Sequence, residues 1–247
     1  MASTFFEIHP YNNFERVPPR TETLIMGTAP PPRFSLPRPP HKGPQKGRDA
    51  DFYYGSGASW LWVYLEKAAN EPTFAEPCTP EAEKEDTEKL MRDFLTRHHL
   101  WMRDILQKFR RKKEGSSRDR DIDVKAEGTE YLDLRSLLKE SMAIRKIAFT
   151  SQDFAAKWTF EAFKEQGLID GSDFNEHLKK WKEISKSENE VQKYKTPFAS
   201  DKYLEGRKID FYILPTPSGA GIANLAVLDI IDVYRAVLFS DRVKASK

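Results

Sequence analysis

The sequence contains almost none of the residues that build disulfide frameworks and metal clusters. One of its 247 residues is cysteine, Cys78, which excludes an internal disulfide, an all-cysteine iron–sulfur cluster and an all-cysteine zinc site. No apolar run approaches the roughly 20 residues needed to span a bilayer. The N-terminal MASTFFEIHPYNN also lacks the basic and apolar parts of a signal peptide. We therefore expect a cytoplasmic protein that does not span a membrane. No close cluster of His, Asp and Glu is evident either, so no metal is expected.

An excess of charge of one sign is also absent. The 40 Lys and Arg residues against 38 Asp and Glu give a formal charge of +2. Overall charge therefore does not indicate nucleic acid, and any basic surface must be local. The 39% of hydrophobic residues is typical of a globular protein. The length fits one large α/β domain or two small ones.

Short apolar runs alternate with helical patterns along the chain. Residues 23–27 (TLIMG), 145–150 (RKIAFT) and 209–214 (IDFYIL) predict buried strands, while residues 100–109 (LWMRDILQKF) fit either strand or helix. Helices are expected at 59–69, from Thr79 onward, and at 133–139, 154–166 and 224–239. Residues 170–207 indicate an amphipathic helical insertion. This alternation predicts a parallel sheet with helices on both faces.

Three unusual segments stand where predicted strands end or in the loops that follow. They are GTAPPP (27–32), DFYYGSGASWLW (51–62) and PTPSGAGIAN (215–224). The carboxyl ends of parallel strands lie on one side of a sheet, so we expect the three segments to share one cleft. Aromatic faces, hydroxyls and exposed amides with few charges suit a flat, uncharged heterocycle. No GxGxxG, GxxxxGK[ST] or GxSxG motif occurs, so no nucleotide cofactor, phosphoryl transfer or serine nucleophile is predicted.

Two segments are locally basic, and each has two interpretations. Residues 33–48 (RFSLPRPPHKGPQKGR) form either a solvated linker or a loop that contacts phosphates. Residues 110–123 (RRKKEGSSRDRDID) form either a solvated loop or a segment that contacts nucleic acid. His9 precedes a proline without a nearby metal-ligand partner, and we interpret it as structural.

The order of the motifs resembles the uracil-DNA glycosylase superfamily, most closely its hypoxanthine-DNA glycosylase-like branch. The matching features are GTxPP, DFYYGS with its aromatics, and a Pro-Ser loop after the last strand. RDILQKFRRKKEGSSRDRDI also resembles that branch's middle segment. The resemblance spans residues 8–224. It implies a three-layer α/β/α fold with a short, mainly parallel sheet, residues 1–247 forming one domain with insertions near 33–50, 70–92 and 170–207.

The resemblance also implies an activity: a DNA base is flipped into the cleft, and water cleaves its N-glycosidic bond. Ser59 stands where this branch has the asparagine that positions the water. The implied base-binding residues are Gly27, Thr28, Ala29, Tyr53, Tyr54 and Gly55. The implied nucleic-acid contacts are Arg38, Lys42, Lys46, Thr216, Ser218 and Gly219. The expected partner is DNA bearing a damaged or deaminated base, bound by a monomer without cofactor, metal or iron–sulfur cluster.

Three hypotheses remain open at the level of the sequence. The first is an active DNA glycosylase of base excision repair. The second is a catalytically impaired member that binds a base, nucleotide or single strand without cleavage, because a serine hydroxyl offers fewer hydrogen bonds than an amide. The third is an unrelated α/β protein whose cleft binds a small heterocycle.

Overall fold

The apolar segment Thr23–Gly27 forms the buried strand β2 at the interior of a mainly parallel sheet. The computed structural model describes residues 5–13, 16–35, 49–57, 59–71, 84–169, 173–187, 190–217 and 225–239. Within these residues the sheet has the order β3-β2-β6-β8-β7. Strands β3 (Leu100–Asp104), β6 (Lys146–Phe149) and β8 (Arg207–Ile213) run parallel to β2. The strands predicted at 23–27 and 145–150 are confirmed.

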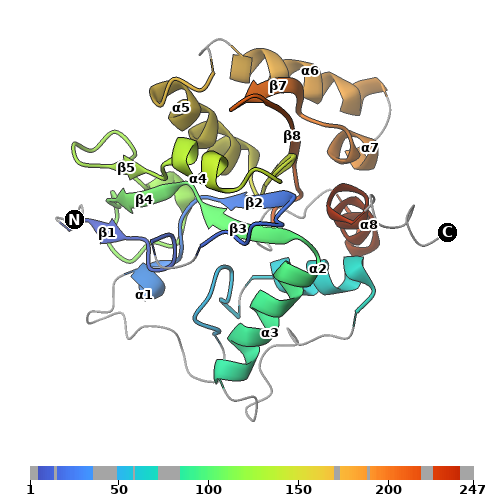
Figure 1. Cartoon of the computed structure of the whole chain (residues 1–247). Coiled ribbons are helices and arrows are strands. Elements are labelled where there is room, and N and C mark those ends of the chain that lie inside the picture. The colour runs from blue at the N-terminus through green and yellow to red at the C-terminus, as the bar shows by residue number, and fades with distance from the viewer. Residues whose placement is uncertain are drawn as a thin grey trace.

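Helices cover both faces of this sheet. Figure 1 shows α4 (Leu134–Glu140) and α5 (Lys157–Glu165) on one side, and α2 (Leu61–Ala69) and α3 (Lys84–Arg97) on the other. Helix α8 (Val227–Leu238) packs beside α2, and the Tyr64 and Tyr234 rings of the two helices are 5.5 Å apart. The predicted three-layer α/β/α architecture is therefore confirmed.

The ambiguous segment 100–109 forms two strands. Strand β3 belongs to the main sheet, and β4 (Leu106–Phe109) belongs to a second, antiparallel sheet of order β1-β4-β5. Strand β1 is Glu7–Ile8 and β5 is Glu130–Tyr131. The chain changes sheet at Ile105, whose backbone N–H donates to the carbonyl of Gly27 at 3.0 Å. The end of β3 is thereby fixed beside the end of β2.

The prediction that residues 170–207 are entirely helical is wrong at its C-terminal end. Helices α6 (Asp173–Ser187) and α7 (Glu190–Lys195) are present, but Ala199–Leu204 forms strand β7, antiparallel to β8. The sequence ASDKYL lacks clear apolar alternation because β7 is an edge strand, and edge strands tolerate charged residues. Glu205 and Gly206 connect β7 to β8 with φ of 48° and 75°, as tight hairpin turns require.

The other helices match the predictions with shifted ends. Helix α2 begins at Leu61 rather than residue 59, and α8 begins at Val227 rather than residue 224. A π-helical turn, Gln152–Ala156, precedes α5, and the side chain of Ser151 accepts a hydrogen bond from the backbone of Ala155 at 2.9 Å. A short α1 (Pro32–Ser35) follows the proline run. The helix start expected at Thr79 lies outside the described residues.

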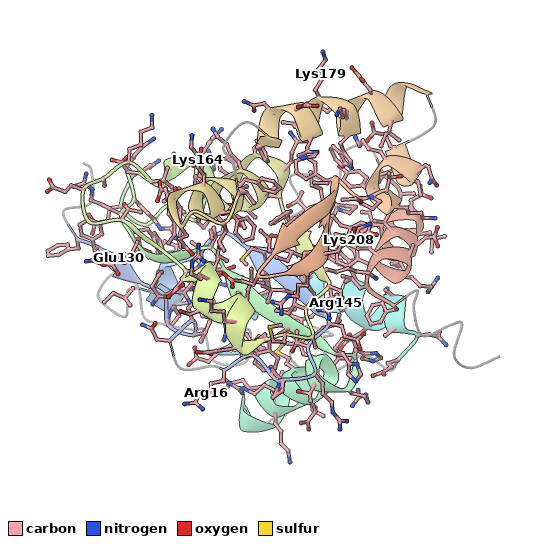
Figure 2. The ribbon with its side chains drawn as sticks, turned by 45° about the horizontal axis from the view of Figure 1, so that its top comes forward. Arg16, Glu130, Arg145, Lys164, Lys179 and Lys208 are labelled. Carbon is pink, nitrogen blue, oxygen red and sulfur yellow. The ribbon has the colours of Figure 1, made fainter. Side chains whose placement is uncertain are left out.

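Apolar side chains fill the space between the layers. Phe149 of β6 and Phe211 of β8 stack with their rings 6.0 Å apart. The charged side chain of Lys179 extends away from the fold in Figure 2, and Lys164 is exposed as well. In the described part of the chain, no helix is long and apolar enough to cross a membrane.

Candidate active site

A cleft of about 930 Å³ opens at the carboxyl ends of β2 and β6. From β2 the chain passes to β3 on one side and later returns to β6 on the other, so the strand order reverses between β2 and β6. Open α/β sheets bind ligands at such reversals. Residues from GTAPPP, DFYYGSGASWLW and the start of PTPSGAGIAN line this cleft, among them Thr28, Ala29, Tyr53, Tyr54, Gly55, Ser59 and Thr216. The three segments therefore share one cleft, as predicted.

A tight turn shapes the aromatic loop at residues 51–59. Gly55 donates its backbone N–H to Phe52, and its own carbonyl accepts from Ala50 at 2.8 Å. A Cβ on Gly55 would lie 2.1 Å from the carbonyl oxygen of Ala50, so this close approach requires glycine. Asp49 anchors the loop, because it accepts two hydrogen bonds from Arg33 and one from the backbone of Gly57.

The two tyrosines of the loop occupy different environments. Tyr53 is 1% exposed although it borders the cleft, and its hydroxyl donates to Oδ1 of the buried Asn12 at 2.9 Å. Tyr54 is only partly buried and has a φ of 54°, which is rare for tyrosine. Its hydroxyl shares a 2.7 Å hydrogen bond with Thr150 Oγ1 at the end of β6. Burial raises the Tyr54 pKa well above its ordinary value, and the nearby Asp104 raises it further.

Gly27 lies beneath this tyrosine and does not itself line the cleft. A Cβ on Gly27 would lie 2.0 Å from Asp104 Oδ1 and 2.2 Å from the Tyr54 hydroxyl. The absence of a side chain therefore brings Asp104 and Tyr54 together over the end of β2. Gly27, an implied base-binding residue, thereby makes room for two residues that line the cleft.

Asp104, the last residue of β3, holds a buried histidine. His9 is fully buried, and its Nδ1 accepts from the backbone N–H groups of Tyr11 and Asn12. The ring proton is therefore on Nε2, which donates to Asp104 Oδ2 at 2.9 Å. Asn12 Nδ2 also donates to the Asp104 carbonyl at 2.8 Å. His9 is thus a positioning partner of a carboxylate that lines the cleft.

A second carboxylate, Asp119, reaches the cleft from the short 3₁₀ turn Asp119–Asp121. Its side chain is half-buried and accepts a hydrogen bond from the hydroxyl of Thr28. Burial raises the pKa of Asp119 to about 6, against the lowering effects of the Thr28 hydrogen bond and the Arg111 charge. Asp119 therefore changes its protonation state near neutral pH.

Ser59 lines the same cleft just before helix α2. Its Oγ is 3.4 Å from the backbone nitrogen of Leu61, which donates to it at the start of the helix. The neighbouring Trp60 N–H donates to the carbonyl of Pro217 at 3.1 Å. This contact brings the loop after β8, which includes Thr216, against the aromatic loop.

The cleft carries more charge than the sequence predicted. Among the described residues, its lining includes the aspartates Asp104, Asp119 and Asp153 and the arginines Arg33, Arg118 and Arg120. The expectation of few charges is wrong. Arg118, Asp119 and Arg120 of the segment 110–123, for which the sequence left a solvated loop and a nucleic-acid contact open, reach the cleft, and the other charged residues come from the end of β3 and from the segments after β2 and β6. Asp104 and Thr150 follow the strand-end rule, which alone would have indicated them. The predicted contacts Arg38, Lys42, Lys46, Ser218 and Gly219 lie outside the described residues.

The described residues contain no group of three His, Cys, Asp or Glu side chains that could hold a metal ion. No family model and no curated protein matches the chain. Among solved structures, the chain is similar to the solution NMR structure of a "putative Uracil DNA glycosylase" from Methanosarcina acetivorans. The identity is 15%, the match covers 94% of this chain and 99% of that one, and the TM-score is 0.45. The fold is established by the sheet order and layers described above.

Proposed function

We propose that this protein is a DNA glycosylase of the uracil-DNA glycosylase superfamily, closest to its hypoxanthine-DNA glycosylase-like branch. It would flip a damaged or deaminated base into the cleft and hydrolyse the N-glycosidic bond as a step of base excision repair. The observation that carries the proposal is the convergence of Thr28–Pro31, the aromatic loop and Thr216 on one cleft at the reversal of strand order. We further propose that residues 1–247 form one domain that acts as a monomer.

Several residues of the cleft support the proposed binding of a flipped base. Tyr54 is the partly exposed member of the tyrosine pair and is our candidate for stacking on the base, whereas the buried Tyr53 fixes the loop. Thr28 and Ala29 would contact the base edge. Ser59, just before helix α2, would orient the water. Thr216, Ser218 and Gly219 would contact the DNA backbone.

One observation favours a second candidate, a protein that binds a flipped base without cleaving it. The Ser59 hydroxyl accepts from the backbone of its own helix, which leaves it fewer ways to orient a water than an asparagine side chain would have. In this alternative, the aromatic loop still stacks on a base.

The test is an abasic-site assay with excess protein on single- and double-stranded oligonucleotides that bear uracil, hypoxanthine or xanthine. We expect strand cleavage after alkaline treatment for at least one base. Ser59→Asn restores the amide of the resembled branch and is expected to increase the rate.

Complete lack of cleavage, together with tighter binding to damage-bearing than to undamaged oligonucleotides, would select the second candidate. The variant Tyr54→Leu tests whether the cleft binds a DNA base, which both candidates require and an unrelated heterocycle-binding protein does not. Loss of base stacking is expected to weaken binding to damaged DNA by about 1–3 kcal/mol. An unchanged affinity for damaged DNA would show that Tyr54 does not stack on the base.

A further inference from the structure

We propose that Asp119 is the catalytic base that accepts a proton from the attacking water, an inference that rests on the proposed glycosylase function. The geometry that points to it is a half-buried carboxylate that lines the cleft and is held by the Thr28 hydroxyl at the end of β2. Nothing in the motif resemblance gives this residue a role, because the resemblance places the water-positioning group at Ser59.

The turn that carries Asp119 places its acidic and basic side chains in different environments. Asp119 is half-buried, whereas its neighbours Arg118 and Arg120 are exposed at the rim of the cleft. Asp121, two residues further on, accepts a hydrogen bond from Ser116 and does not line the cleft. The turn thus places one negative charge inside, where a sugar cation would form, and two positive charges outside, where phosphates would pass.

Other elements place charged groups against Asp119. Asp104 from the end of β3 raises its pKa, and the buried guanidinium of Arg111, which follows β4, lowers it. The phenol of Tyr54 faces both carboxylates from the aromatic loop. Arg111 is itself held by Glu7 Oε1 at 2.9 Å and by the carbonyl of Pro30 at 2.7 Å, so its position is fixed.

Asp119 suits the role better than the other groups of the cleft. Asp104 already accepts a hydrogen bond from the ring N–H of His9, which holds that carboxylate in place. A serine hydroxyl such as that of Ser59 orients a water but does not take its proton at neutral pH. A carboxylate with a pKa of about 6 is ionised at pH 7 and still basic enough to accept a proton in the transition state.

The reaction step balances with water as the sole co-reactant. The C1′–N bond of the damaged nucleotide breaks, and its electron pair leaves with the base. The water oxygen forms a bond to C1′, and one water proton passes to Asp119 and then to the departing base nitrogen. The ionised carboxylate also stabilises the positive charge that develops on the sugar ring.

The test compares Asp119→Asn with the matched control Asp121→Asn from the same turn. Single-turnover cleavage of the best damaged-base oligonucleotide is expected to fall by about 10²- to 10⁴-fold in Asp119→Asn and to stay within about twofold of wild type in Asp121→Asn. The wild-type rate should rise about tenfold per pH unit up to a pKa near 6 and then level off. Asp119→Asn should lack this rise, an outcome that a purely structural role would not produce.

A binding measurement gives a readout that does not depend on turnover. Duplexes with a cationic pyrrolidine or a neutral tetrahydrofuran in place of the damaged nucleotide mimic the charged and uncharged sugar. Wild type and Asp121→Asn should prefer the cationic analogue, and Asp119→Asn should lose that preference while it binds the neutral analogue as well as wild type does.

The outcomes separate the two proposals. If wild type cleaves and Asp119→Asn cleaves equally fast with an unchanged pH profile, the role of Asp119 is refuted while the glycosylase function stands. If wild type neither forms abasic sites nor prefers the cationic analogue, both proposals fail. Circular dichroism of each variant confirms that lost activity is not lost folding.

Discussion

At the scale of single residues, the floor of the cleft depends on Gly27. The Asp104 carboxylate and the Tyr54 hydroxyl both occupy the space that a side chain at position 27 would need. Asp104 is hydrogen-bonded to His9 and Tyr54 to Thr150, so moving either side chain out of this space would break a hydrogen bond. Tyr54 also adopts a left-handed backbone conformation, which costs on the order of 1 kcal/mol and often occurs at functional sites.

We predict that Gly27→Ala destabilises the protein by about 1–3 kcal/mol, because the added methyl group overpacks a site with fixed neighbours. Chemical denaturation measures this loss. The matched control is Gly206→Ala, where φ is 75° and nothing lies within 4 Å, so its cost should be limited to backbone strain of about 1 kcal/mol. Unfolding midpoints that were equal in Gly27→Ala and wild type would contradict the described packing.

At the scale of elements, helix α4 shows how the sequence fixes a boundary locally. Asp133 accepts hydrogen bonds from the backbone N–H of Ser136 at 2.9 Å and from its hydroxyl at 2.7 Å. The Ser136 backbone bond is the main cause of the lowered Asp133 pKa. Asp133 was predicted to start this helix because the cap depends on residues only three positions apart.

We predict that Asp133→Ala lowers the free energy of unfolding by about 1 kcal/mol at pH 7, whereas Asp133→Asn retains a capping oxygen and loses less. Because the folded-state pKa of Asp133 lies below its unfolded value, the charge-dependent part of the stabilisation is present above about pH 4 and is lost as the pH falls below it. Urea denaturation at pH 7 and pH 3 measures both effects. If the difference in unfolding free energy between wild type and Asp133→Ala grew toward low pH, the charged Asp133 would not be the stabilising cap.

At the scale of the whole molecule, a nearly neutral chain places its charge unevenly around the cleft. The formal charge is only +2, yet Arg118 and Arg120 lie exposed at the rim. Lysines elsewhere, such as Lys164 on α5 and Lys179 on α6 (labelled in Figure 2), are exposed and do not line the cleft. Phosphate contacts from the described residues are therefore expected at the rim.

We predict that the double variant Arg118→Gln/Arg120→Gln weakens DNA binding and flattens its salt dependence. The slope of log K against log salt concentration should fall in magnitude by about 2 for duplex DNA, because two phosphate contacts are lost. Fluorescence anisotropy at several salt concentrations measures the slope. The control Lys164→Gln/Lys179→Gln removes the same charge outside the cleft and should leave the slope unchanged. If both double variants changed the slope equally, the phosphate contacts would not be specific to Arg118 and Arg120.

Local patterns in the sequence determined the layered α/β architecture and the location of the cleft. Strands 23–27 and 145–150 are short apolar runs, and the segments after them contain the residues that meet at the carboxyl ends. These features depend on periodicity and on neighbouring turn residues, which act over a few positions. The position of Thr28, Tyr54 and Ser59 in one cleft follows from them.

The tertiary structure alone decided which further side chains enter the cleft and what they contact there. The His9–Asp104 and Tyr54–Thr150 bonds join residues 95 and 96 positions apart, and no local pattern encodes such pairs. Strand β7 exists because β8 offers it an edge, although its own sequence lacks strand alternation. Asp119 lies in a charge-dense run that the sequence left open as a solvated loop or a nucleic-acid contact, and only the packing of that loop beside Thr28 turns this one carboxylate inward.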